Sequence, residues 1–91
     1  MDFEWDEAKS RWTRDTRGFG FDVAALVFDG PTVEVIDERR DYGEERIIAI
    51  GRVEREILTV VFTDRGDIRR IISARRANRQ ERMLWRQFAS R

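Results

Sequence analysis

The spacing of apolar residues changes from a helical to an alternating period close to residue 31. Between residues 5 and 28, apolar side chains recur three and four positions apart, which is the period of one helix face. From residue 33 to residue 74, short Val- and Ile-rich runs are bounded by glycine or charged residues, as in β-strands. The pattern predicts helices first and a sheet after them.

A first helix is expected to begin after Asp6, because the carboxylate of an N-cap aspartate accepts hydrogen bonds from free backbone N–H groups. Trp5, Ala8 and Trp12 have helical spacing and are expected to face the core. Gly18 is expected to end this helix, since glycine readily adopts the backbone conformation of a C-terminal cap.

Two further helices are expected. The second covers Phe21 to Phe28 and ends before Gly30, and the third covers Asn78 to Ala89. Asn78 and Glu81 have the spacing of a capping box. The third helix is expected to carry its apolar side chains on one side and its arginines on the other. These are Leu84, Trp85 and Phe88, and Arg79, Arg82 and Arg86.

Four strands are expected between the second and third helices: Val33 to Asp37, Arg46 to Arg52, Glu56 to Thr63 and Asp67 to Ala74. The connections at residues 51–55 and 64–66 have hairpin length, which is too short for a parallel crossover. The predicted fold class is α+β, with two N-terminal helices, a four-stranded antiparallel sheet and a C-terminal helix. The sheet has five strands if Phe3 to Trp5 counts as one.

Alternation along the last two strands predicts one apolar and one basic face. Leu58, Val60 and Phe62 are expected in the core, with Thr59 and Thr63 on the other side. In the final strand, Arg69, Ser73 and Arg75 are expected to share a face that can hold phosphodiester oxygens. The alternative is a solvated face whose arginines pair with acids of the N-terminal half.

Composition limits the kinds of chemistry. The 91 residues include no cysteine and no histidine, so a thiol nucleophile and the metal sites built from those ligands are excluded. Carboxylates are spread through turns and the first helix, so neither a metal nor another cofactor is expected. The length predicts a single domain over residues 1–91. The acidic first ten residues do not resemble a signal peptide, and no membrane span is expected, which makes the cytoplasm the expected location.

The net charge of zero hides an asymmetry. Residues 1–64 hold 9 basic and 16 acidic side chains, whereas residues 65–91 hold 9 arginines and 2 acids. This asymmetry favours a polyanion or an acidic partner at the C-terminal part, unless the two blocks fold together and neutralise each other. Arginine suits either partner, because its planar fork binds phosphate and carboxylate groups alike.

Three segments resemble the BrnT family, the toxins of a bacterial type II toxin–antitoxin system. They read FEWDEAK near the start, DYGEERIIAIGR in the middle and RIISARRANRQER near the end. The resemblance implies a RelE-like ribonuclease fold, RNA cleavage without a metal and neutralisation by a ribbon-helix-helix antitoxin, BrnA. Because that antitoxin also represses the operon, any contact of the toxin with DNA would be indirect.

The chain departs from the family pattern at two histidines. Where the family usually reads K-H-G, this chain has Thr16, Arg17 and Gly18, and where it usually reads R-H, this chain has Arg39 and Arg40. If either histidine is the acid or the base of the family, this chain must use other groups.

The predicted activity is endoribonuclease cleavage by attack of the ribose 2′-hydroxyl on the adjacent phosphate. Arg69, Arg75 and Arg79 are the expected phosphate contacts, and these groups are expected to converge in one pocket. Glu45 is the candidate base, and Tyr42 or Lys9 the candidate donor to the leaving oxygen. RNA docking, or an acidic antitoxin surface, is assigned to Arg82 and Arg86, and Ser73 to substrate binding.

A noncatalytic module is the alternative function. Such a protein would bind RNA, or would hold the antitoxin as a degenerate toxin. The two hypotheses differ in the effect of Arg75→Ala, which abolishes toxicity only if the protein is an enzyme.

Overall fold

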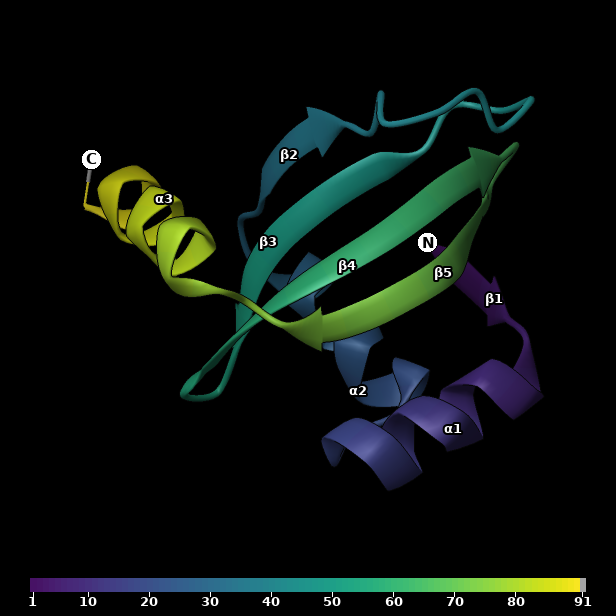
Figure 1. Cartoon of the computed structure of the whole chain (residues 1–91), viewed down its shortest axis with the longest axis horizontal. Helices are drawn as coiled ribbons and strands as arrows, with labels where there is room; N and C mark the ends of the chain where they lie inside the picture. The colour runs from purple at the N-terminus through teal and green to yellow at the C-terminus, as the bar shows by residue number, and fades with distance from the viewer. Residues whose placement is uncertain (91) are drawn as a thin grey trace.

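A five-stranded sheet organises residues 1–90, the part of the chain that the structure, a computed structural model, describes. The strands lie in the order β1-β5-β4-β3-β2, and α3 lies at one end of the sheet (Figure 1). Along the chain the elements are β1 (Asp2–Trp5), α1 (Glu7–Arg17), α2 (Phe21–Ala24), the 3₁₀ helix η1 (Ala25–Asp29), β2 (Val33–Ile36), β3 (Ile47–Val53), β4 (Glu56–Arg65), β5 (Ile68–Arg76) and α3 (Arg79–Ala89).

The predicted limits of the first helix are confirmed. Its predicted core face is wrong for Ala8 and Trp12, which are exposed, whereas Trp5 packs partly buried against the core. The Asp6 side chain accepts hydrogen bonds from the N–H groups of Ala8 and Lys9, and Gly18 caps the other end with a φ of 89°. Ser10 and Thr13 are the buried residues of α1, whereas Trp12 is 56% exposed. The Ser10 hydroxyl accepts a hydrogen bond from the N–H of Phe21, so α1 meets α2 through a polar contact instead of an aromatic one.

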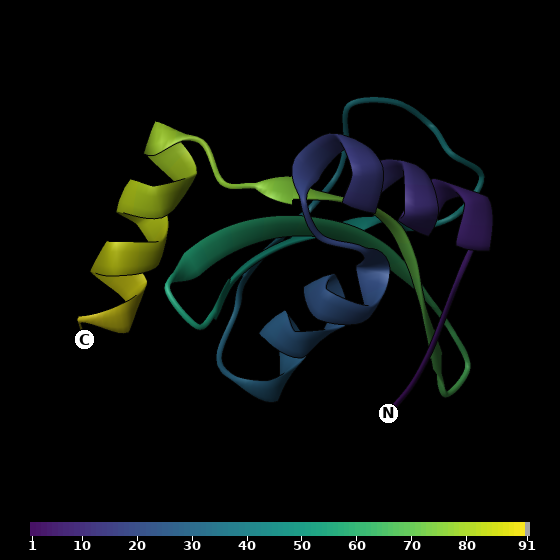
Figure 2. The same ribbon diagram turned by 90° about the horizontal axis from the view of Figure 1, so that it is seen from below.

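The second predicted helix begins at Phe21 as expected, but it is α-helical only as far as Ala24. The chain then tightens into η1. Phe21, Ala24 and Val27 are all buried, and their spacing of three residues is the period of a 3₁₀ helix. One face of the tightened helix therefore stays on the sheet, and Figure 2 shows α2 and η1 beneath it.

The prediction of a purely antiparallel sheet is wrong. Strands β2 to β5 pair antiparallel, but β1 pairs parallel with β5, with Phe3 opposite Arg69. A hairpin forces two strands to run in opposite directions, and no hairpin joins the first strand to the last. The sheet is therefore mixed, with five strands.

A bulge in β5 reverses the predicted face of one arginine. Val61 is opposite Ser73 and the next residue of β4, Phe62, is opposite Ile71, so Ile72 is an extra residue. As a result Ile71 and Ala74 both point into the core. The predicted core positions of β4 are confirmed, since Leu58, Val60 and Phe62 are buried on the same face.

The capping box of the last helix is confirmed: Asn78 and Glu81 each accept a hydrogen bond from the backbone N–H of the other. α3 packs against β2, β3 and β4 and buries Trp85. Leu84 and Phe88 remain 50% and 36% exposed, so the apolar side of this helix is only partly covered. Within residues 1–90 no helix has the length and apolar character needed to cross a membrane.

Candidate functional site

α2 and η1 cover one face of the sheet. The opposite face is open, and it lies between two features. At one end lies α3, and at the other lies the loop of residues 37–46 between β2 and β3 (Figure 1). Across this open face, Val35, Ile48, Val61 and Ser73 lie opposite one another in register on four neighbouring strands. The open face thus has an apolar centre, with a serine hydroxyl on β5.

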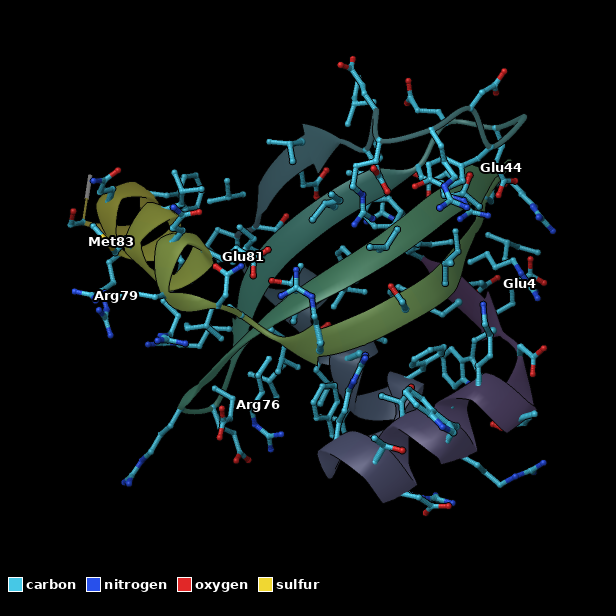
Figure 3. The ribbon with its side chains drawn as sticks, viewed as in Figure 1. Glu4, Glu44, Arg76, Arg79, Glu81 and Met83 are labelled. Carbon is cyan, nitrogen blue, oxygen red and sulfur yellow. The ribbon has the colours of Figure 1, made fainter. Side chains whose placement is uncertain are left out.

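Arg75 lies on this open face next to α3. Its Nη1 and Nη2 atoms donate hydrogen bonds of 2.7 and 2.9 Å to the two carboxylate oxygens of Glu81, and Figure 3 shows Glu81 pointing from α3 towards the sheet. The hydrogen bond to Arg75 lowers the pKa of Glu81, and the hydrogen bond to Glu81 raises the pKa of Arg75. Arg75 is therefore held in one orientation while its side chain stays 42% exposed.

The loop of residues 37–46 carries a second anchored arginine. The Asp37 side chain, only 1% exposed, accepts hydrogen bonds from Nε and Nη2 of Arg39 at 2.8 and 2.7 Å, and from the Tyr42 hydroxyl at 3.0 Å. The hydrogen bond from the Arg39 side chain is the main reason why the pKa of Asp37 lies well below its ordinary value. The guanidinium group of Arg46 stacks 4.0 Å from the centre of the Tyr42 ring.

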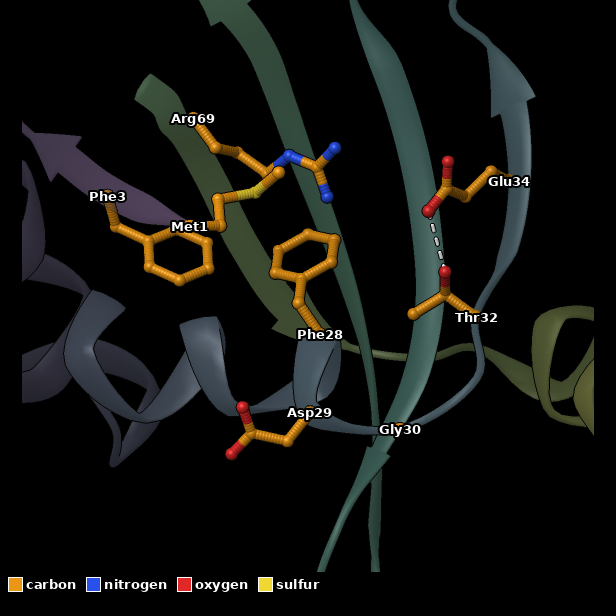
Figure 4. Close-up of a pocket in the computed structure, with 8 residues that line it drawn as sticks. All are labelled: Met1, Phe3, Phe28, Asp29, Gly30, Thr32, Glu34 and Arg69. Atoms are coloured by element: carbon orange, nitrogen blue, oxygen red, sulfur yellow. Dashed lines mark hydrogen bonds between the residues drawn. The ribbon is translucent and has the colours of Figure 1, made fainter. Parts of the chain in front are cut away.

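Arg69 does not join Arg75, because the bulge places it on the opposite face of the sheet. Its guanidinium group lies over the rings of Phe28 and Phe62 and donates two hydrogen bonds, of 2.8 and 3.0 Å, to Asp64. It borders a separate hollow, which Met1, Phe3, Phe28 and Glu34 also line (Figure 4). The prediction that Arg69, Ser73 and Arg75 share a face is wrong for Arg69.

Arg79 also lies apart from Arg75, because it points away from the sheet on the outer side of α3 (Figure 3). The predicted convergence of Arg69, Arg75 and Arg79 in one pocket is therefore wrong. Arg86 is exposed on the same helix, and Arg82 donates a hydrogen bond of 2.7 Å to the carbonyl of Ala77. No ion pair involves these three helix arginines within residues 1–90.

The remaining predicted residues have different surroundings. The Tyr42 hydroxyl donates a hydrogen bond to the Asp37 carboxylate. The Glu45 side chain is exposed, and its carbonyl accepts a hydrogen bond from Thr63. Lys9 is exposed on α1, which packs against α2 and β5. In the described part of the chain, neither Lys9 nor Glu45 makes a side-chain hydrogen bond or ion pair with Arg75.

Acids of the N-terminal half neutralise part of the basic C-terminal block, as the alternative interpretation of the charge asymmetry expects. The ion pairs are Arg65 with Glu4 and Glu44, Arg69 with Asp64, Arg70 with Glu4 and Arg76 with Glu56. The neutralised arginines come from the last two strands, so positive charge is left mainly on α3. Residues 1–90 contain no group of three or more carboxylates placed to hold a metal ion together.

A family model described as "Ribonuclease toxin, BrnT, of type II toxin-antitoxin system" matches residues 5–81. The chain belongs to the BrnT family. This family is one of ribonuclease toxins that act with an antitoxin partner, and the resemblance seen in the sequence is confirmed. A comparison with curated proteins gives no match for the chain.

The two arginines that stand where the sequence resemblance implies histidines differ in their surroundings. Arg17 donates a hydrogen bond of 2.7 Å to the carbonyl of Ala74 and stacks on Trp12, so it ties α1 to the edge of β5. Arg40 is exposed in the loop of residues 37–46. Arg17 therefore has a structural role here, whereas Arg40 is free of such a contact within residues 1–90.

Sequence reasoning missed Arg39 and Asp37 as members of the site. The signal was present, since a carboxylate two residues before an arginine can accept both of its forked hydrogen bonds. What the local sequence does not show is that Asp37 is buried, and burial strengthens this pairing because water does not compete for the carboxylate.

Proposed function

We propose that this BrnT family member is an active endoribonuclease that cleaves RNA on the open face of the sheet, in the cytoplasm. The observation that carries the proposal is Arg75, a partly exposed arginine that Glu81 fixes in place on a face with an exposed serine, Ser73. A preorganised guanidinium group stabilises charge that develops on phosphate oxygens, because it needs no reorganisation during the reaction.

The proposed reaction is attack of the ribose 2′-oxygen on the adjacent phosphorus. A bond forms between these two atoms, and the bond from phosphorus to the 5′-oxygen breaks. The 2′-hydroxyl loses a proton to a base and the 5′-oxygen gains one, which leaves a 2′,3′-cyclic phosphate and a 5′-hydroxyl end. Such a step uses neither a metal ion nor a water nucleophile.

Roles follow from the positions of the side chains. Arg75 donates to a non-bridging phosphate oxygen, and Ser73, in the same strand and on the same face, binds the substrate. Glu45 remains the candidate base and Tyr42 the candidate proton donor. Tyr42 lies at the open face, where its proton is already shared with Asp37. Arg69, Arg79 and Lys9 are left out of the catalytic group, because they lie on other surfaces.

We further propose that the antitoxin is a ribbon-helix-helix protein. Family membership supports an antitoxin partner, and the outer surface of α3 supports a place for an acidic surface of that protein or for the RNA backbone. Arg79 and Arg86 are exposed there beside Met83 and Leu84, which are 49% and 50% exposed.

The test is incubation of the purified protein with single-stranded RNA in the presence of a chelator. We expect cleavage to products with cyclic phosphate ends, and a rate about 10²- to 10³-fold lower for Arg75→Ala. Arg55→Ala is the matched control, since Arg55 is an exposed arginine in the turn between β3 and β4.

Two results together would refute the proposed ribonuclease activity and favour the noncatalytic binding function. They are the absence of cleavage by folded wild-type protein and normal growth of a culture that expresses it without antitoxin.

A further inference from the structure

Asp37 fixes the position of an arginine that is itself largely exposed. The Asp37 backbone N–H donates to the carbonyl of Arg46 at 2.7 Å, which extends the pairing of β2 with β3 by one residue. Its buried carboxylate accepts from the Arg39 side chain twice, from the Arg39 backbone and from Tyr42. The guanidinium group of Arg39 is thus held rigidly although its side chain is 69% exposed.

The geometry of the two anchored arginines leaves one hydrogen-bonding edge of each available. Arg39 uses Nε and Nη2 for Asp37, and Arg75 uses Nη1 and Nη2 for Glu81. The Nη1–Nη2 edge of Arg39 and the Nε–Nη2 edge of Arg75 therefore retain N–H groups beyond those that donate to Asp37 and Glu81. Such an edge donates two parallel hydrogen bonds to a phosphate.

Both arginines belong to the open face. Asp37 comes two residues after Val35 and Arg75 two residues after Ser73, so each lies on the same face as its neighbour. The row of paired residues Val35, Ile48, Val61 and Ser73 therefore lies between Asp37 and Arg75. The charge of Arg39 acts on Arg75, whose pKa it lowers against the larger effect of Glu81. The row that separates Asp37 from Arg75 is largely apolar, since it holds Val35, Ile48 and Val61.

We propose that Arg39 and Arg75 form a two-guanidinium clamp for a single phosphodiester group of RNA, with Asp37 and Glu81 as positioning residues. The inference rests on the proposed function and assigns the phosphate-binding group within it. A phosphodiester has two non-bridging oxygens, so one edge of each arginine can bind it from opposite sides. Because Asp37 and Glu81 cancel the two positive charges, the clamp selects phosphate by directed hydrogen bonds more than by net charge.

A double-mutant cycle on RNA affinity tests whether the two arginines hold the same phosphate. The probe is a 2′-O-methyl RNA oligonucleotide, which lacks the attacking hydroxyl and is bound without cleavage. Arg39→Ala and Arg75→Ala should each weaken binding about tenfold to a hundredfold. The double variant should bind scarcely more weakly than the worse single variant, because a phosphate released by one arginine gains little from the other.

Arg40→Ala is the matched control, since it removes the same charge one residue away. Its effect should be small and should multiply with that of Arg75→Ala. If the effects of Arg39→Ala and Arg75→Ala also multiply, or if folded wild-type protein does not bind the probe, the clamp is wrong. Coupled effects without cleavage of ordinary RNA would leave the clamp intact and overturn the proposed function instead.

The positioning role of Asp37 has its own readout. Asp37→Asn should weaken binding as Arg39→Ala does, whereas Glu38→Gln, an exposed carboxylate one residue away, should not. In protein that already carries Arg39→Ala, Asp37→Asn should have no further effect on RNA affinity. A further loss there would show that Asp37 acts on the whole loop and would refute the assigned role. Arg39→Lys should not restore binding, because lysine lacks the second forked donor.

Discussion

The carboxylate of Glu81 serves the backbone of Asn78 and the side chain of Arg75 at the same time. It accepts from the Asn78 N–H at 2.9 Å and from Arg75 at 2.7 and 2.9 Å. One residue thus starts α3 and orients the arginine at the end of β5. The start of α3 and the orientation of Arg75 therefore depend on the same carboxylate, and substitutions of Glu81 should affect both.

Glu81→Gln should lower the free energy of unfolding by about 1 kcal/mol, because glutamine keeps the cap but weakens the charged hydrogen bonds to a partly exposed arginine. Urea unfolding measures this change. Glu56→Gln is the control, since Glu56 pairs with Arg76 at 3.4 Å on the surface and should contribute less than about 0.5 kcal/mol. Equal losses in both variants would contradict the link between α3 and β5.

Stability should fall in acid. Hydrogen bonds from Arg39 and Arg75 hold the pKa values of Asp37 and Glu81 below their ordinary range. A depressed pKa in the folded state stabilises the protein above the unfolded pKa, and this contribution is lost as the pH falls towards the folded value. The urea midpoint should therefore be nearly constant from pH 7 to about 5 and should drop below about pH 4.

Asp37→Asn should make that drop shallower, because one of the two groups no longer takes up a proton on unfolding. Glu38→Gln should leave the pH profile of the wild type unchanged. An identical acid profile for Asp37→Asn and wild type would mean that Asp37 is not the group responsible.

Gly51 and Gly30 offer a matched test of close packing. A Cβ at Gly51 would lie 2.8 Å from the Cβ of Val27, whereas a Cβ at Gly30 would have no neighbour within 4 Å. Gly51→Ala should therefore cost about 1–3 kcal/mol by forcing η1 away from the sheet. Gly30→Ala should change stability by less than about 0.5 kcal/mol in the same unfolding experiment. The reverse order would argue against the packing of η1 on β3.

Two tryptophans should differ in their contribution to stability. Trp85 is 7% exposed, and Trp12 is 56% exposed and stacks only against Arg17 in the described contacts. Trp85→Ala should destabilise the fold by about 3–5 kcal/mol, and Trp12→Ala by less than about 1 kcal/mol. Thermal or urea unfolding distinguishes these values, and a large loss for Trp12→Ala would restore the core role that its spacing suggests.

RNA affinity should depend on salt in proportion to the phosphates that the protein contacts. If about five phosphates are contacted, the log–log slope should be roughly −3 to −4 for single-stranded RNA, and each lost contact should reduce it by about 0.7. Arg79→Ala and Arg86→Ala should each produce such a reduction if α3 docks RNA. Arg55→Ala should leave the slope unchanged. A flat slope for the wild-type protein would count against RNA binding.

Several features of this chain were predictable because they depend on contacts within a few residues. Asp6 and Gly18 limit α1, and Asn78 and Glu81 begin α3, as their residue types indicate. The four Val- and Ile-rich strands form where their composition places them. Family membership was likewise readable from three segments in order along the chain, and the family model matches residues 5–81.

The errors share a physical cause, which is that each needed knowledge of a distant partner. One extra residue, Ile72, reverses the face on which Arg69 lies, and only the pairing of β5 with β4 reveals it. Nothing local distinguishes Trp12 from Trp85, since both fit a helical apolar period, but only Trp85 meets a surface that can cover it.

By itself the sequence determined the helix ends, the strand segments and the supply of arginines, because caps and propensities are properties of short stretches. Tertiary structure alone decided the direction of β1, the faces of β5 and the placement of Arg39 and Arg75 on one open surface. The reason is that strand register and burial depend on residues far apart in the chain. Local sequence can therefore indicate a candidate side chain, but the neighbours of that side chain are set only when the strands pair.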